Sequence, residues 1–465
     1  MAIHQEQIQE IQGFDKEIEQ SAMGMILDNL QQYQYQYPQK STVRELVSNA
    51  LDAIRERHIA LSILSGQAKV EDHFITRQEA LYKDSNFDPS YYDTKWLTNH
   101  SPLIDPNKVY VTYVDGGGRE EDKLLIEDDG VGMGGKRLEG YFKLGFSTKR
   151  NTKSALGKFG IGAKAALATA SSYIMTTRYN GEEYKFQVYS HRISSVVPEL
   201  NLETGERNQC RTLSNGAVVY YRTTDKPNGT SIEVECKKHH RQLYIDAVKS
   251  QLLYFDNVEF RIRNSSGGTD IIPVKANILY EDDHVILSDN TQYSKPHMLI
   301  NKVNYGNIDF RELELEDMQG NIGIKVDAEE VTVNPSRESL IWNEHTRETV
   351  VRSFKKVVDI AGGMISEQLQ ERDFLKWAVA CSQVSGRWAG SSTILGRLSN
   401  IVDISSAKVK YSQDPEIIYN YDLFKGIKIR TNRLSVKREG SVEKYTVERE
   451  RTTMTDLASG MSMFI

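Results

Sequence analysis

The sequence predicts an α+β protein, and three observations carry that prediction. Glu45, Asn49 and Asp52 are spaced i, i+4 and i+7, so a helix would place their polar groups on one stripe. A short apolar run at residues 124–126 ends in acids and glycines, which is typical of a buried strand that turns sharply. Strand-like segments and turns alternate from residue 109 to residue 234. We therefore expect a sheet with helices on one face.

Composition narrows the class of protein. The chain has 465 residues, of which 39% are hydrophobic and 26% charged, and this is typical of a globular protein with room for two or three domains. The net charge of −6 argues against a protein that coats nucleic acid electrostatically. No apolar run predicts a membrane span or a signal peptide, and the three cysteines lack metal-ligand spacing. We expect a cytoplasmic protein.

The helix around Glu45 is the first candidate site. Its two carboxylates and its amide would share one stripe, while Val43, Leu46 and Val47 lie to the other side and can pack. A carboxylate, an amide and a second carboxylate on one face can hold a metal ion and a water. A solvated helix face is the alternative, which this segment alone leaves open.

The turn that follows the apolar run is the second candidate site. Asp128 and Asp129 are followed by Gly130, Gly132 and Met133. Glycines at such a turn allow the backbone to pass close to something flat or bulky. An ordinary Asp-Gly turn is the alternative.

A second glycine-rich segment spans residues 157–162. Its backbone N–H groups can converge on phosphate oxygens, and the alanine-rich run after Gly162 predicts a helix whose N-terminus favours anions. A mostly polar lid precedes this segment, and Lys149, Lys158 and Lys164 are among the residues that add positive charge around it.

Two familiar nucleotide patterns are set aside. The segment from Gly130 to Arg137 differs from a P-loop because Arg137 replaces the Ser or Thr that binds magnesium. The run from Gly160 to Ala165 mimics a dinucleotide fingerprint, but it follows a polar lid where that fingerprint requires a strand.

A fourth segment, Asn228-Gly229-Thr230, enters an alternating strand and completes an ordered set. Together, the Glu45 helix, the Asp128 turn, the second glycine segment and this turn resemble the four motifs of the GHKL ATPase superfamily. That superfamily includes DNA gyrase B subunits, MutL, the ninety-kilodalton heat-shock chaperone, MORC proteins and histidine kinases. The resemblance implies an ATP-binding sandwich of mixed sheet and helices, the Bergerat fold.

The resemblance also implies a role for each site residue. Glu45 would be the general base that polarises the attacking water, and Asn49 would bind Mg²⁺. Asp128 would accept a hydrogen bond from the adenine amine, supported through water by Thr230. The other ATP-binding residues would be those of the first helix, the base pocket, the lid and the phosphate loop: Asp52, Gly130, Gly132, Met133, Ser147, Thr148, Lys149, Gly157, Lys158, Phe159, Gly160, Ile161 and Gly162.

Three regions follow along the chain. Residues 1–235 would form the ATP-binding domain with an insertion at 66–106, residues 236–370 a transducer-like α+β domain similar to ribosomal protein S5 domain 2, and residues 371–465 a small C-terminal region. In the second domain, Arg337 lies in a segment that resembles the one from which a chaperone arginine reaches the ATP γ-phosphate. Arg337 is therefore a second catalytic candidate, and a surface arginine in an ion pair is the alternative.

The function expected is that of a slow Mg²⁺-dependent ATPase that acts as an ATP-gated conformational clamp. Residues 322–365 add a resemblance to the rapid-lysis IIA proteins of T-even phages, which implies action in a phage-infected cell. The superfamily resemblance implies an ATP-dependent homodimer. A nucleotide-clamped binding or scaffold module, similar to MORC proteins or chaperones, and the ATPase subunit of a topoisomerase remain open.

The sequence does not identify the molecule on which such an ATPase would act. The insertion at 66–106 and the C-terminal region are candidate surfaces for a protein partner, and peripheral membrane or DNA contact is not excluded. Basic and apolar residues alternate from Lys425 to Arg451, which fits strands with one basic face. That face is either solvated or a nucleic-acid site.

Overall fold

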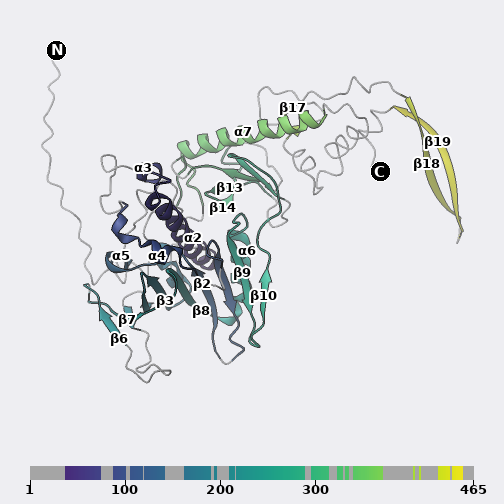
Figure 1. Cartoon of the computed structure of the whole chain (residues 1–465). Coiled ribbons are helices and arrows are strands. Elements are labelled where there is room, and N and C mark those ends of the chain that lie inside the picture. Colours follow the sequence, from purple (N-terminus) through teal and green to yellow (C-terminus); the bar gives the residue numbers. More distant parts are fainter. Residues whose placement is uncertain are drawn as a thin grey trace, which may run out of the picture. The chain divides into compact units, whose positions relative to one another are not determined.

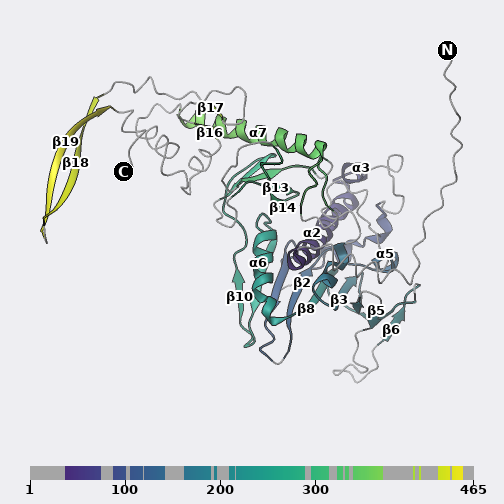
Figure 2. The ribbon, with the colours of Figure 1, turned by 180° about the vertical axis from the view of Figure 1, so that it is seen from behind.

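The computed structural model describes residues 37–74, 87–100, 105–118, 120–141, 162–189, 193–195, 209–214, 216–288, 295–313, 322–327, 330–334, 339–369, 402–403, 408–409, 428–439 and 442–453. The chain divides into two compact units. Unit 1 comprises Met1–Arg241 with Arg261–Asp270, and unit 2 comprises Gln242–Phe260 with Ile271–Ile465. Figures 1 and 2 show the elements of both units from opposite sides. Helices combined with one largely antiparallel and one mixed sheet make the protein α+β, as the sequence predicts.

The larger sheet, most of which belongs to unit 1, is antiparallel at each of its strand pairs from β1 to β8. In the described part of the chain its order is β10-β9-β1-β2-β8-β3-β4-β7-β6, and β5 pairs with β4. The strands are β1 (Val109–Val114), β2 (Asp122–Asp128), β3 (Ser172–Tyr179), β4 (Glu182–Tyr189), β5 (Ile193–Ser195), β6 (Gln209–Thr212), β7 (Val218–Thr223), β8 (Gly229–Cys236), β9 (Val258–Arg263) and β10 (Thr269–Ile272).

One face of this sheet is apolar because the strands alternate with a period of two residues. Leu124 on β2 is paired with Val234 on β8, and Val234 with Tyr173 on β3; all three are buried. Helix α2 (Pro38–Leu64) is the long helix of unit 1 (Figure 1), and it contacts β1 and β2. It supplies further buried apolar side chains, among them Val43, Leu46 and Val47. Packing of the long helix on the sheet forms the core of unit 1.

Shorter helices complete unit 1. In the described residues they are α3 (Val70–His73), η2 (Pro89–Tyr91), α4 (Thr94–Thr98), α5 (Gly135–Tyr141), η3 (Gly162–Ala168) and η4 (Lys238–His240). The alanine-rich run after Gly162 is thus helical as expected, but it is a 3₁₀ helix rather than an α-helix. Ala165 and Ala166 are buried, and small side chains allow this tighter coil to approach α2 closely.

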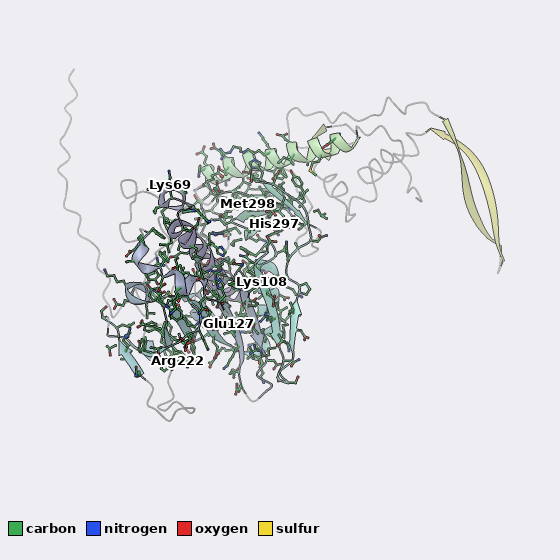
Figure 3. The ribbon with its side chains drawn as sticks, viewed as in Figure 1. Lys69, Lys108, Glu127, Arg222, His297 and Met298 are labelled. Atoms are coloured by element: carbon green, nitrogen blue, oxygen red, sulfur yellow. The ribbon has the colours of Figure 1, made fainter. Side chains whose placement is uncertain are left out.

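Unit 2 has a five-stranded sheet in the described residues, with the order β11-β12-β15-β13-β14. Strands β13 and β15 are parallel, so the sheet is mixed. Tyr254, Ile286 and Leu299 belong to one buried cluster of its core, and His297 and Met298 lie on β13 (Figure 3). The elements are α6 (Arg241–Gln251), β11 (Ile278–Glu281), β12 (Val285–Ser288), β13 (His297–Ile300), β14 (Val303–Asn307), β15 (Ile322–Lys325) and α7 (Glu344–Leu369).

Two further hairpins are described in the C-terminal part of the chain. One joins β16 (Val402–Asp403) to β17 (Lys408–Val409), and the other joins β18 (Lys428–Glu439) to β19 (Val442–Thr453). The strands predicted for the basic segment from Lys425 to Arg451 are therefore present. The expected N-terminal helix, before residue 37, lies outside the described residues.

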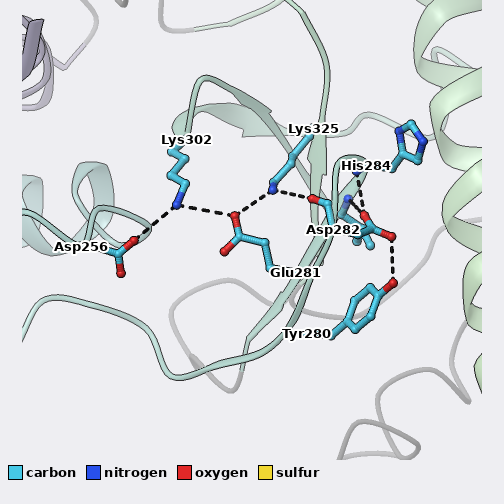
Figure 4. A network of polar contacts seen from close by, with 8 residues as sticks. Asp256, Tyr280, Glu281, Asp282, His284, Lys302 and Lys325 are labelled. Atoms are coloured by element: carbon cyan, nitrogen blue, oxygen red, sulfur yellow. Dashed lines mark hydrogen bonds and ion pairs between the residues drawn. The ribbon is translucent and has the colours of Figure 1, made fainter. Parts of the chain in front are cut away.

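A network of ion pairs connects the ends of β11 and β15 to the turn between β13 and β14 and to the segment after α6 (Figure 4). The Lys302 ammonium lies 3.5 Å from Asp256 Oδ2 and 3.5 Å from Glu281 Oε1, and Lys325 Nζ lies 2.8 Å from the same Glu281 oxygen. Lys302 and its neighbour Asn301 both have positive φ, at 68° and 52°, in the turn between β13 and β14. One member of the network, Lys302, therefore has a backbone conformation that residues other than glycine rarely adopt.

Candidate active site

Three polar side chains lie next to each other across three neighbouring strands of unit 1. Asp128 is the last residue of β2, Thr230 on β8 is its direct partner, and Thr177 on β3 is paired with Thr230. Asp128 is 5% exposed and Thr177 is fully buried. By alternation they share the face of Leu124 and Tyr173, which is the face that α2 covers. A carboxylate and two hydroxyls thus converge at one end of the sheet beneath the helix.

The backbone of the next loop, residues 129–134, is fixed by two of these side chains. The amide of Gly130 donates to Asp128 Oδ1 at 2.8 Å, and the amide of Met133 donates to Thr177 Oγ1 at 2.8 Å. A Cβ atom on Gly130 would come within 2.6 Å of the Cβ of Ala53 in α2. The loop therefore passes against α2 at a point where only glycine fits.

The polar stripe of α2 lies inside the protein. Glu45 and Asp52 are each 4% exposed, and Asn49 between them is partly buried. Arg44, itself buried, donates from Nε to Glu45 Oε1 at 3.3 Å and from Nη2 to Ser41 Oγ at 3.2 Å. A solvated helix face, the alternative that the sequence left open, is therefore wrong.

The three consecutive acids at the end of β2 have different surroundings. Glu127 lies on the opposite face of the strand from Asp128, because side chains alternate along β2, and burial raises the pKa of its carboxyl group. Asp129 is buried, and its Oδ1 accepts from Arg178 Nη2 at 3.4 Å. Arg57 of α2 donates to the Asp129 carbonyl. Only Asp128 of the three belongs to the cluster with the two threonines.

Sequence reasoning missed two residues that shape this site. Thr177 could have been found, because it follows Tyr173 and Met175 at the spacing of one strand face. Arg57 carries no such signal, since it matters only through contacts far away in the sequence. It is 2% exposed, it also donates from Nη2 to Asn107 Oδ1 at 3.0 Å, and burial lowers the pKa of its guanidinium.

The phosphate side of the predicted site is described only in part. Gly162 begins η3, and this helix is tied to α2 because the Thr42 hydroxyl donates to the carbonyl of Ala165 at 3.0 Å. The end of the second glycine segment therefore lies beside the first turns of α2, close in sequence to Glu45. The other residues predicted for the lid, the phosphate loop and the second domain lie outside the described residues: Ser147, Thr148, Lys149, Gly157, Lys158, Phe159, Gly160, Ile161 and Arg337.

A comparison with known families bears on this geometry. Residues 37–216 match the family described as histidine kinase-, DNA gyrase B-, and HSP90-like ATPase. This ATPase-family match includes α2, the loop after β2 and Thr177, and it ends before Thr230. No curated protein matches the chain. Across the described residues, no helix is both long and apolar enough to cross a membrane.

Proposed function

We propose that the chain is a Mg²⁺-dependent ATP-binding protein and a slow ATPase that works as an ATP-gated conformational clamp. One observation carries the proposal: Asp128, Thr177 and Thr230 lie side by side beneath the helix that bears Glu45 and Asn49. Most of this arrangement lies within the stretch that matches an ATPase family. ATP binding is a property of that family. The dependence on Mg²⁺ and the clamp mechanism are parts of our proposal that go beyond the family match.

The residues present fit a nucleotide base. A buried carboxylate at Asp128 can accept a hydrogen bond from an exocyclic amine, and the hydroxyl of Thr230 can support it through water. Gly130, Gly132 and Met133 border the same cluster, and both glycines are required because a Cβ atom would overlap Ala53 at Gly130 and the carbonyl oxygen of Arg178 at Gly132. We assign these residues to the base.

The hydrolytic roles fall to α2. Glu45 would accept a hydrogen bond from a water and polarise it, and the donation from Arg44 to Oε1 fixes the orientation of its carboxylate. The Asn49 side chain offers an amide oxygen to Mg²⁺, an ion that takes few protein ligands and keeps several waters. When bound, Mg²⁺ would neutralise charge on the phosphates. The same proposal gives phosphate contacts to residues 157–162, lid closure to residues 147–149 and γ-phosphate sensing to Arg337.

A second function has one observation in its favour. Glu45 and Arg44 form a buried ion pair, and a carboxylate held by a guanidinium is less available to orient a water. This contact favours a module that binds nucleotide as a structural clamp with little turnover. The resemblance to the rapid-lysis IIA proteins stays a prediction in both cases.

Two substitutions in the full chain distinguish these functions. Asp128→Asn should weaken ATP binding by about tenfold or more, because an amide oxygen accepts a hydrogen bond less strongly and the NH₂ group opposes a donor. Glu45→Gln should keep ATP binding and lower phosphate release by about tenfold or more. Glutamine is used because alanine would leave Arg44 buried without this acceptor. Calorimetry with Mg-ATP and a phosphate-release assay measure the two effects.

Glu235→Gln is the matched control, since this exposed carboxylate lies on β8 with Thr230. It should bind and hydrolyse ATP like the wild type. A wild-type chain that binds ATP without hydrolysing it would establish the second function. Hydrolysis by Glu45→Gln at the wild-type rate would remove Glu45 from the role of base.

A further inference from the structure

A tyrosine outside the four nucleotide motifs is bonded to the backbone of the glycine loop. Tyr91 belongs to η2, in the predicted insertion. Its hydroxyl donates to the carbonyl of Gly132 at 3.3 Å and accepts from the amide of Gly134 at 3.3 Å. Burial raises the pKa of Tyr91, so the hydroxyl keeps its proton and can do both. One side chain therefore bridges two peptide groups of the loop that follows Asp128.

Arg137 holds this tyrosine in place. Its guanidinium carbon lies 3.8 Å from the centre of the Tyr91 ring, and its Nη2 donates to the Tyr92 hydroxyl at 2.9 Å. Arg137 also pairs with Glu56 of α2, and the Tyr92 hydroxyl donates to Glu56 Oε1 at 2.5 Å. Arg137, which departs from the P-loop pattern in the sequence, thus connects the insertion to α2.

The insertion and the sheet hold the loop between them. Tyr179 on β3 donates its hydroxyl to the carbonyl of Tyr91 at 2.5 Å, and the two ring centres are 4.5 Å apart. Val131, which lies between Gly130 and Gly132, is buried in one cluster with Tyr92 and Leu97 of the insertion. Thr177 holds the amide of Met133 from the sheet. The loop conformation therefore depends on the insertion as well as on β3.

We infer that the insertion segment 87–98 positions the loop that receives the nucleotide base, with Tyr91 as the positioning residue. This inference rests on the proposed function, because it assumes that the loop at residues 129–134 binds a base. The Tyr91 hydroxyl does not itself contact nucleotide in this account. It keeps the peptide groups of Gly132 and Gly134 in one orientation, so that the base meets a loop that is already ordered.

Tyr91→Phe in the full chain tests the inference. Loss of one bridging hydroxyl should raise KM for ATP about fivefold, the factor that corresponds to about 1 kcal/mol of hydrogen bonding, while kcat stays within about twofold. Tyr113→Phe is the matched control. Tyr113 lies on β1 of the same sheet, and its buried hydroxyl donates to Asp122 Oδ2 on β2 at 2.7 Å. Loss of this hydroxyl should leave KM for ATP unchanged.

Hydrogen exchange without nucleotide gives a second readout. The amides of residues 129–134 should exchange faster in Tyr91→Phe than in the wild type or in Tyr113→Phe. A Tyr91→Phe protein with unchanged KM overturns the inference while the proposed function stands, and so does an equal rise of KM in both variants. A wild-type chain that binds no ATP overturns the proposed function and this inference together.

Discussion

The buried polar residues of the site each accept a hydrogen bond from a different donor. Glu45 is paired with a cation, Asp128 accepts from the amide of Gly130, and Thr177 accepts from the amide of Met133. A buried donor that loses its acceptor costs more than the hydrogen bond itself contributes. Substitutions that remove one of these acceptors should therefore lower the free energy of unfolding by more than the loss of a typical hydrogen bond.

Thr177→Val tests this at the residue with no predicted role. Valine has nearly the same shape but leaves the Met133 amide without its acceptor, so the free energy of unfolding should fall by about 1–3 kcal/mol and ATP affinity should fall with it. Thr112→Val on β1 is the control, because it removes an equally buried hydroxyl on a strand that is not adjacent to β3. Calorimetric melting and ATP titration of both variants measure the difference. Normal ATP affinity in Thr177→Val would contradict the role given to this hydroxyl.

His297 makes unit 2 sensitive to acid. Its side chain is fully buried, with Nε2 2.6 Å from the Tyr254 hydroxyl, and burial lowers the pKa of the imidazole to about 4. The unfolded chain binds a proton at this imidazole at higher pH than the folded chain does. The contribution of neutral His297 to the free energy of unfolding is therefore fully present above pH 6.5. It should fall as pH decreases toward 4, by about 3 kcal/mol in total.

Melting curves between pH 7.5 and pH 4 measure this loss, with the chain compared to His297→Gln. The variant should be less stable at neutral pH, since glutamine fits the space differently, but the part of the pH dependence between 6.5 and 4 should be reduced in it. Identical slopes in both proteins would show that His297 does not titrate on unfolding as its burial implies.

Among the elements, the turn between β13 and β14 combines an unfavourable backbone with favourable charges. A two-residue turn with positive φ at both positions prefers glycine at the second, where this chain has Lys302. Lys302→Gly should therefore raise the free energy of unfolding by about 1 kcal/mol, since the ion pairs that it loses are partly exposed. Lys302→Ala is the control, because it removes the same charges and keeps a side chain at positive φ. Denaturant unfolding should rank glycine above lysine, and lysine at or slightly above alanine. A glycine variant less stable than lysine would mean that the charges outweigh the backbone.

The elements also show what sequence reasoning could predict. The stripe of Glu45, Asn49 and Asp52 and the turn after Asp128 were predictable because both depend on local spacing. The 3₁₀ form of η3 and the bridge from Tyr91 to the loop were not, because they depend on packing between segments distant in sequence. Arg137 shows the difference well. Its position excluded a P-loop, but nothing local indicated its contact with Tyr91.

For the molecule as a whole, the proposed clamp requires that ATP change how chains associate. The chain has a mass of 52.9 kDa, and with a non-hydrolysable ATP analogue at micromolar protein we expect light scattering to report about twice that value. Asp128→Asn should need at least about ten times more analogue to reach the same doubled mass, because its affinity for the nucleotide is lower by about that factor. An unchanged monomer mass of the wild type under saturating analogue would contradict ATP-dependent dimerisation and leave the hydrolytic roles untouched.

Gly132 is constrained by the fold itself, independently of nucleotide binding. Its φ of 67° and the overlap that a Cβ would make with the carbonyl oxygen of Arg178 are both internal to the protein. In a saturation library sorted only for folded protein, position 132 should therefore be depleted of every alternative residue, by at least about 2 kcal/mol each. At position 128, asparagine still offers an oxygen to the Gly130 amide, so this substitution should be depleted mainly when the library is sorted for ATP binding. Two positions four residues apart would thus report on separate selective pressures, one from folding and one from ligand.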